Sequence, residues 1–265
     1  MDAGMTTQCS SQMSDPTGFV TAARKSEQAL CEQLCEWESL PYGVAFWSEA
    51  FPWAAEANQL RDVWLADVNG QSAFEQAEVY FGQRGLKCGR WTPASGQAVE
   101  PVAELLLRHG WQKKTSTVWG LSSWSLLEAP ADESMRILPA RAMPKALRAT
   151  FDDGAPDSDR RAELAAERLN DSRLDLFVAM HDGKPVGRVG YLQVGDIARL
   201  SELFVLSDSR RIGVGRAMAT HFMQLARRLL PHVIVACSKV DDAPAAAFLG
   251  AMGFSSAGEI EHFER

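Results

Sequence analysis

Apolar and polar positions follow two different periods along the second half of the chain. From Val214 onward the apolar residues recur every three to four positions, which predicts an amphipathic helix that ends before Pro231. The segments 174–180 and 232–238 are short, apolar and rich in β-branched residues, as buried strands are. In order, residues 135–265 predict a strand, two helices, a hairpin, a strand, a helix, a strand, a helix and a last strand. This alternation is typical of an α/β fold.

The first half carries a related but less regular pattern. A helix is predicted at roughly 19–37 and strands around 42–47 and 58–65, followed alternately by a helix, a strand, a helix and a strand up to residue 121. Gly110-Trp111 and Gly253-Phe254 lie 143 residues apart, and the same offset places Gly70 on Gly213, Asp67 on Arg210 and Ser72 on Gly215. This spacing predicts an internal repeat whose first copy has kept a turn and lost an arginine and a glycine.

The segment 126–134 has the proline, alanine and acidic character of a linker. We therefore expect a disordered leader at 1–15, a first domain at 16–125, a linker at 126–134 and a second domain at 135–265. The leader has neither a basic start nor an apolar stretch, so it does not resemble a signal peptide.

Composition narrows the class of protein. Of the 265 residues, 46% are hydrophobic and 23% are charged, as in globular proteins, and no apolar run approaches the ~18 residues of a membrane span. The net charge of −7 argues against nucleic acid as a partner. The odd number of cysteines without a framework spacing indicates a reducing, cytoplasmic setting. Cys31 and Cys35 share a helix face without a third ligand nearby, so we expect buried packing there and no metal.

The stretch LFVLSDSRRIGVGRAM, residues 203–218, passes from a strand to a helix through two glycines. Unpaired amides at a helix start, together with the helix dipole, favour an anion such as phosphate. Gly213 and Gly215 would let it reach the backbone, and Arg210, Arg211 and Arg216 would add positive charge. A phosphate loop of the GxxxxGK[ST] type is absent, and a dinucleotide GxGxxG would need glycine at Met218. The alternative is that the two glycines merely suit the backbone at the start of a helix and that no anion binds there.

Residues 135–265 resemble the GNAT superfamily of acyl-CoA-dependent N-acyltransferases. Its signature, R/Q-x-x-G-x-G/A at a strand-to-helix turn, is met by Arg210, Gly213 and Gly215, and its later Gly-Phe by Gly253-Phe254. The resemblance implies an α/β protein of two GNAT-like domains, each a mixed central sheet flanked by helices, with the first a degenerate copy. It also implies an N-acetyltransferase that moves an acetyl group from acetyl-CoA to a primary amine on a small molecule or peptide.

The resemblance further implies where acetyl-CoA binds. The pantetheine arm would lie between the strands at 198–206 and 232–238, hydrogen-bonded near Val205. The residues expected at the cofactor are Val205, Arg210, Arg211, Ile212, Gly213, Val214, Gly215, Arg216 and Asp242.

Two positions bear on catalysis. Glu202 lies in the strand where the family commonly carries its general base, although a solvent-facing strand residue explains it equally. Leu249 stands where the family often has a tyrosine that protonates the leaving thiolate, and Tyr191 and Cys237 are the possible substitutes. The acidic loop at 152–159 could attract an amine or simply be solvated. A non-catalytic acyl-CoA-binding protein is therefore the alternative, and an interaction module is disfavoured by the intact RRIGVG.

Overall fold

The computed structural model describes residues 16–65, 69–96, 100–123 and 134–265. The predicted leader, most of the predicted linker and Asp67 lie outside the described residues. In chain order the elements are α1 (Pro16–Glu32), β1 (Glu36–Leu40), β2 (Gly43–Trp47), β3 (Gln59–Val63), α2 (Gly70–Gly82), β4 (Arg90–Pro93), α3 (Glu100–Arg108), β5 (Gln112–Leu121), β6 (Met135–Pro139), the 3-10 helix η1 (Ala140–Ala142), α4 (Pro144–Ala149), α5 (Ser158–Arg168), β7 (Leu174–His181), β8 (Lys184–Val194), β9 (Ile197–Val205), the 3-10 helix η2 (Ser207–Ser209), α6 (Val214–Leu229), β10 (Val233–Lys239), α7 (Ala243–Ala251) and β11 (Phe254–Glu264).

The strands of the described chain form one mixed sheet that runs through both halves. Its order is β1-β2-β3-β4-β11-β5-β10-β9-β8-β7-β6, and only the pairs β3–β4 and β9–β10 are parallel. The predicted α/β class, with mixed sheets flanked by helices, is confirmed. The sheets of the two halves join edge to edge.

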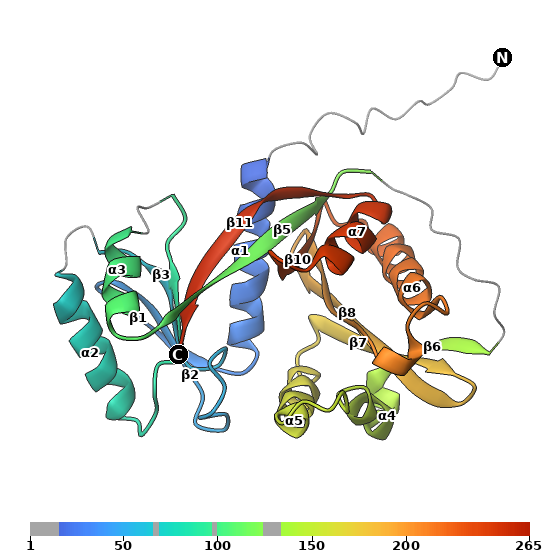
Figure 1. Cartoon of the computed structure of the whole chain (residues 1–265), viewed down its shortest axis with the longest axis horizontal. Helices are drawn as coiled ribbons and strands as arrows, with labels where there is room; N and C mark the ends of the chain where they lie inside the picture. Colours follow the sequence, from blue (N-terminus) through green and yellow to red (C-terminus); the bar gives the residue numbers. More distant parts are fainter. Residues whose placement is uncertain (1–15, 66–68, 97–99, 124–133) are drawn as a thin grey trace, which may run out of the picture.

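The join depends on a strand from the first half. β5 lies between β10 and β11, with Gly120 opposite Val235 on one side and Leu121 opposite Phe254 on the other. In Figure 1 β5 and β11 run side by side across the centre of the molecule. The far end of β11 then pairs with β4, where Glu264 lies opposite Arg90. The division into domains at 16–125 and 135–265 stays a prediction made from the sequence. The hydrogen-bonded sheet is continuous across the predicted boundary.

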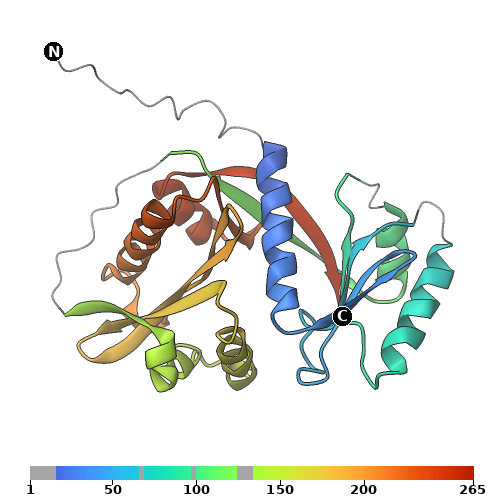
Figure 2. The ribbon, with the colours of Figure 1, turned by 180° about the vertical axis from the view of Figure 1, so that it is seen from behind.

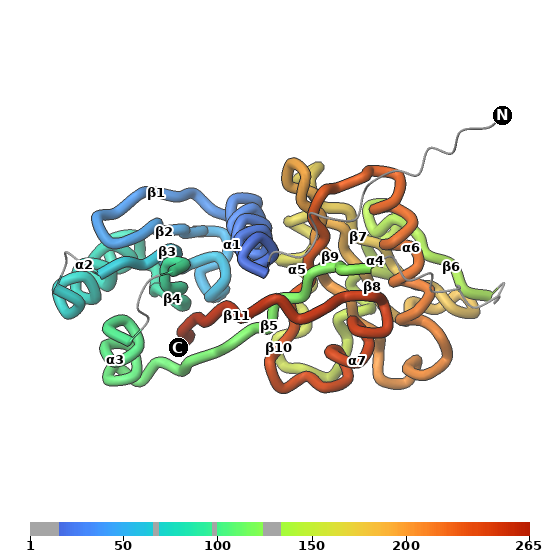
Figure 3. The backbone as a smooth tube through the Cα atoms, turned by 90° about the horizontal axis from the view of Figure 1, so that it is seen from above, coloured from blue at the N-terminus to red at the C-terminus, as the bar shows by residue number. Residues whose placement is uncertain are grey.

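Helices cover both faces of this sheet. α1, α4 and α5 pack on one face, and α6 and α7 cover the other over the second half, where they enclose the largest apolar cluster. α2 and α3 enclose a separate cluster over the strands of the first half. Figure 2, from behind, shows α1 lying across the middle of the sheet, and Figure 3 shows it beside β5 and β11, against which it packs.

A partly buried carboxylate holds α1 on both halves at once. Glu27 pairs with Arg61 of β3 at 3.4 Å and with Arg199 of β9 at 3.6 Å. Burial opposes ionisation of Glu27, but the charges of Arg199 and Arg61 outweigh it, so the pKa of Glu27 lies below its usual value. The charged network at the centre therefore fixes the two halves against one helix.

The internal repeat is visible in the element bounds. α3 and α7 lie 143 residues apart at both ends, as do the first residues of β4 and β10. The glycines that follow α3 and α7, Gly110 and Gly253, both have positive φ, at 81° and 89°. They end the two helices in the same left-handed conformation.

One helix of the first half is shorter than predicted. The expected helix at roughly 19–37 ends as α1 at Glu32, and residues 36–40 form β1, an edge strand paired with β2. Glu36, Trp37 and Glu38 are all exposed, so no alternation of buried and exposed positions marked this segment as a strand. Its pairing with β2 determines that this segment is a strand.

Candidate functional site

The turn between β9 and α6 presents a run of free backbone donors. Among the described residues, the amides of 211–216 donate no hydrogen bond, and the first bond after them is from Ala217 N to the Gly213 carbonyl at 3.0 Å. Arg211 and Gly213 have φ of 68° and 96°. Left-handed residues at a helix start turn successive N–H groups toward one side, which makes an anion-binding site.

The two glycines of the turn have different roles. Gly213 is the N-cap of α6 in a left-handed conformation that most side chains disfavour. A Cβ added at Gly215 would meet only ordinary contacts, 3.5 Å to the ring of Phe248 and 3.8 Å to Val205. A small side chain would therefore be tolerated at Gly215, in contact with Phe248 and Val205.

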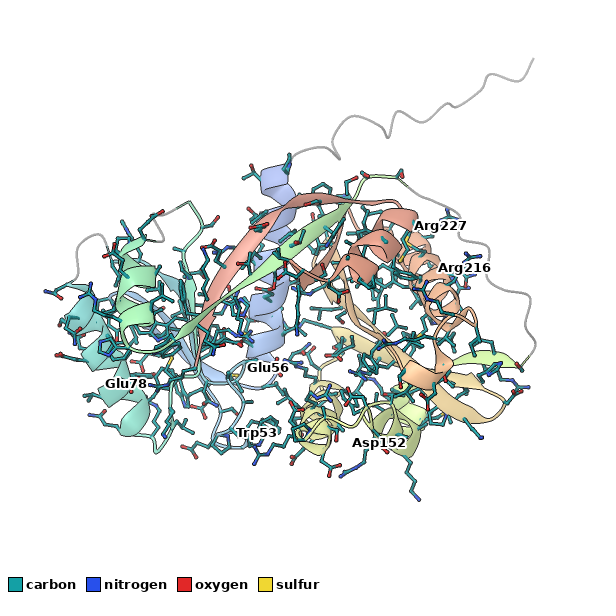
Figure 4. All side chains as sticks on the ribbon, in the orientation of Figure 1. Trp53, Glu56, Glu78, Asp152, Arg216 and Arg227 are labelled. Atoms are coloured by element: carbon teal, nitrogen blue, oxygen red, sulfur yellow. The ribbon has the colours of Figure 1, made fainter. Side chains whose placement is uncertain are left out.

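The arginines of the turn surround it with positive charge. Arg210, Arg211 and Arg216 are exposed, and Figure 4 labels Arg216 on the surface of α6. Nε of Arg210 donates to the Val205 carbonyl at 3.2 Å, which leaves this oxygen a second lone pair for a ligand. Ile212 is exposed at the tip of the turn, and Val214 is buried in the core below it.

Two parallel strands separate beside the turn. The pairing of β9 with β10 ends at Leu200 and Ala236. Beyond it, residues 201–205 pair only with β8, and residues 237–239 only with β5. Asp242 follows β10 beyond this point, and its Oδ1 accepts from the Ala245 amide at 2.9 Å. Its carboxylate is thus already used to cap α7.

In the matching turn of the first half, two amides at the helix start are already bonded. Oδ1 of Asn69 accepts hydrogen bonds from the amides of Gln71 at 2.9 Å and Ser72 at 3.3 Å. The first turn of α2 is therefore capped by its own side chain.

Glu202 lies in a bulge of β9 near the point where the strands separate. The β8–β9 register shifts between Arg188–Phe204 and Gly190–Ser201, and Glu202 has a φ of 51°. The bulge turns Glu202 toward α4 and α5, where Oε2 lies 3.1 Å from Nε of Arg188 and Oε1 lies 3.8 Å from Nη1 of Arg168.

Arg188 is held tightly among residues of the second half. It is 5% exposed, donates to the Thr150 carbonyl at 2.7 Å, and lies 3.6 Å from the ring centre of Phe151 and 4.7 Å from that of Phe204. Burial lowers the pKa of Arg188 below its usual value, although the charge of Glu202 acts in the opposite direction. Glu202 is thus a paired carboxylate rather than a solvated one.

The other catalytic candidates do not converge on Glu202. Leu249 is 5% exposed and belongs to the core under α6 and α7. Tyr191 belongs to the same core, on the other face of the sheet from Glu202, and burial raises its pKa to about 12. Cys237 packs toward α1, and burial raises its pKa too.

The acidic loop is largely neutralised by arginines. Asp153 pairs with Arg161 at 2.7 Å, and Asp159 pairs with Arg148 at 2.8 Å. These pairs favour the solvated-loop interpretation. No group of three or more histidine, cysteine or acidic residues in the described ranges could hold a metal ion.

Sequence reasoning missed the two arginines beside Glu202. Arg188 did leave a signal, because it stands inside the apolar strand VGRVGYLQV, where an arginine needs a buried partner. Arg168 left none, since it follows the helical pattern of α5 as an ordinary last-turn cation.

A family model described as acetyltransferase (GNAT) family matches residues 140–254. No curated protein matches the sequence significantly. None of the helices in the described part of the chain is long and apolar enough to cross a membrane.

Solved structures share the fold over most of the chain at low sequence identity. A functionally unknown conserved protein from Staphylococcus epidermidis has a TM-score of 0.65 and 14% identity, over 85% of this chain and 91% of that one. A GCN5-related N-acetyltransferase from Kribbella flavida has a TM-score of 0.63 and 15% identity, over 92% and 95%. A tandem GNAT protein from the clavulanic acid biosynthesis pathway has a TM-score of 0.60 and 13% identity, over 91% and 87%.

Proposed function

Because residues 140–254 belong to the acetyltransferase (GNAT) family, whose members carry out acyl-CoA-dependent acyl transfer, we propose that this protein moves an acetyl group from acetyl-CoA to a primary amine. The observation that supports this best is the run of free amides at 211–216, flanked by three arginines and adjoining the open end of the β9–β10 pair.

We assign the pyrophosphate of coenzyme A to these amides, with Arg210, Arg211 and Arg216 supplying charge. The Val205 carbonyl has a second lone pair that can accept from an amide of the pantetheine arm. Gly215 carries no side chain, which lets the phosphates approach the backbone there. The carboxylate of Asp242 caps α7, so its role is to fix the start of that helix beside the ligand.

The chemistry requires a protonated amine to lose two protons, one before attack and one as the amide forms. The neutral amine nitrogen attacks the thioester carbon, the carbon–sulfur bond breaks, and the electron pair departs on sulfur. We assign the first proton to Oε1 of Glu202, directly or through a water molecule, and the second passes to the departing sulfur or to solvent. A thiol pKa of about 8.5 lets the thiolate leave without the tyrosine that Leu249 replaces. Holding the thioester beside the amine supplies much of the rate.

A second candidate is an acyl-CoA-binding protein without transfer activity. Two observations favour it: Leu249 is buried in the core, and Glu202 is already paired with Arg188. Such a protein would bind acetyl-CoA at the same site without transferring the acetyl group.

The two candidates are separated by titration and turnover measured on the same protein. Calorimetry with acetyl-CoA should give one site per chain, and release of free thiol should then depend on an added amine. Binding without amine-dependent thiol release across polyamines, aminoglycosides, amino acids and peptide N-termini would favour the second candidate. Failure to bind acetyl-CoA would contradict both.

A further inference from the structure

Glu56 brings the first half of the chain to the residues around Glu202. It lies in the connection between β2 and β3, and its Oε2 is 3.5 Å from Nη2 of Arg168, the last residue of α5. Figure 4 shows Glu56 and Trp53 on the side of the first half that faces α5.

This connection is firmly placed, so the position of Glu56 is set by the fold. The side-chain amide of Asn58 donates to the carbonyls of Phe51 and Ala54 at 2.8 and 3.1 Å, and its oxygen accepts from the Ser48 amide. Phe51, Ala54 and Ala57 then pack against Leu164 of α5.

Arg168 is shared between two carboxylates and is committed to neither. Its contacts to Glu56 at 3.5 Å and to Glu202 at 3.8 Å are both longer than the roughly 2.7–2.9 Å of a charge-assisted hydrogen bond. Its Nε is buried without a hydrogen-bond partner among the described residues. Burial opposes the charge of Arg168, but Glu56 and then Glu202 outweigh it, and its pKa is raised.

The two oxygens of Glu202 therefore differ in freedom. Oε2 is fixed by Arg188, whose other contacts all come from the second half. Among the described residues, the charged partner of Oε1 is the loosely held Nη1 of Arg168, and Nη2 of the same guanidinium lies beside Glu56.

We propose that Glu56 is a positioning residue for acyl transfer: by drawing Arg168 away from Glu202, it keeps Oε1 free to take the proton of the acceptor amine. The inference rests on the proposed function. Without Glu56, Arg168 retains a single carboxylate partner and closes on Oε1. A carboxylate with both oxygens bound by guanidinium groups accepts a proton poorly. The degenerate half then contributes to the reaction without binding acetyl-CoA.

The direct test is Glu56→Gln, which keeps the shape of a side chain that is 37% exposed. We expect kcat to fall about tenfold, a part of the roughly 10²–10⁴-fold that a positioned base contributes, while KM for acetyl-CoA stays the same. Glu49→Gln is the matched control, because Glu49 is an exposed acidic residue in the same connection. It should leave both constants unchanged.

A double variant separates positioning from a structural role. In Glu56→Gln with Arg168→Gln no guanidinium competes for Oε1, so kcat should return to within about twofold of the wild type. If Glu56 had only a structural role, Glu56→Gln would lower the melting temperature, and adding Arg168→Gln would not restore kcat. An unchanged kcat in Glu56→Gln, or no recovery in a folded double variant that binds acetyl-CoA normally, overturns the inference.

A crystal structure of Glu56→Gln gives a readout that does not depend on turnover. We expect Arg168 to move from 3.8 Å to within about 3 Å of Glu202 Oε1. An unmoved Arg168 overturns the inference even if the enzyme is active. A wild type that releases no thiol with any amine contradicts the proposed function instead, and the movement of Arg168 is then judged separately.

Discussion

Asn69 accepts a hydrogen bond from the Ser72 amide at 3.3 Å and so caps the first turn of α2 with its own side chain. The repeat places α2 opposite α6, where Gly213 is the N-cap and offers no side-chain acceptor. In the described part of the first copy the cap bonds two of the donors, whereas the amides of 211–216 in the second copy donate no hydrogen bond. This difference predicts which half binds an anionic ligand.

We therefore expect one coenzyme A site per chain, located in the second half. Gly215→Glu should weaken binding at least about 100-fold, because a carboxylate would stand in the space that phosphate needs, whereas Gly215→Ala should fold normally, since its Cβ meets nothing closer than 3.5 Å. Isothermal titration calorimetry measures both. Two equivalent sites per chain would contradict the prediction.

Replacing Arg211 should have opposite effects on the stability of the fold and on the affinity for coenzyme A. Its φ of 68° is unfavourable for a residue with a side chain by about 1–2 kcal/mol, and glycine at this position would relieve that strain. The greater freedom of glycine in the unfolded chain offsets about half of the stabilisation gained. Arg211→Gly should thus raise the melting temperature slightly and weaken coenzyme A binding several-fold, with a smaller salt dependence. Ile212→Gly relieves no such strain and should only destabilise. Thermal shift and calorimetry at two salt concentrations test the pair.

Glu202→Gln should slow turnover by roughly 10²–10⁴-fold, because the amide cannot take the proton of the amine. Affinity for coenzyme A should hardly change, since Glu202 lies outside the free amides of the turn. Activity should recover partly at high pH, where more of the amine is unprotonated. Equal turnover of variant and wild type from pH 6 to 9 would remove Glu202 from the reaction.

Glu264 makes the join between the two half-sheets sensitive to acid. A hydrogen bond with His262 lowers its pKa most, and the charge of Arg90 adds to this, while partial burial acts the other way; the pKa is about 2. Because this value is below that of the unfolded chain, the stabilisation is present above about pH 4.5 and is lost as the pH falls toward 2.

Glu264→Gln should therefore cost about 1–2 kcal/mol at pH 7, after allowance for solvent screening, and less at pH 3. Denaturant unfolding at the two pH values measures the difference. Glu259→Gln, an exposed carboxylate on the same strand, serves as the control. An equal loss for Glu264→Gln at both pH values would show that its charge does not matter.

The second half should not fold as an isolated fragment. In residues 130–265 both β10 and β11 lack β5, which pairs with each of them along most of its length. The fragment also lacks Trp119, whose Nε1 donates to the Ser238 Oγ at 3.0 Å where β9 and β10 have separated. We expect poor solubility or a dispersionless NMR spectrum, with no acetyl transfer. A soluble fragment with the activity of the whole chain would disprove this.

The sequence by itself determined the local features of this protein. The strand-to-helix turn at 203–218, the helix from Val214, the Asp242 cap and the 143-residue repeat could all be predicted, because periodicity, glycine and capping residues act over a few neighbouring positions. Only tertiary structure decided that β5 lies between β10 and β11, that Arg188 and Arg168 lie beside Glu202, and that Glu56 lies beside Arg168. These contacts join residues far apart in the chain, and the identity of a buried charge's partner depends on packing that no local pattern encodes.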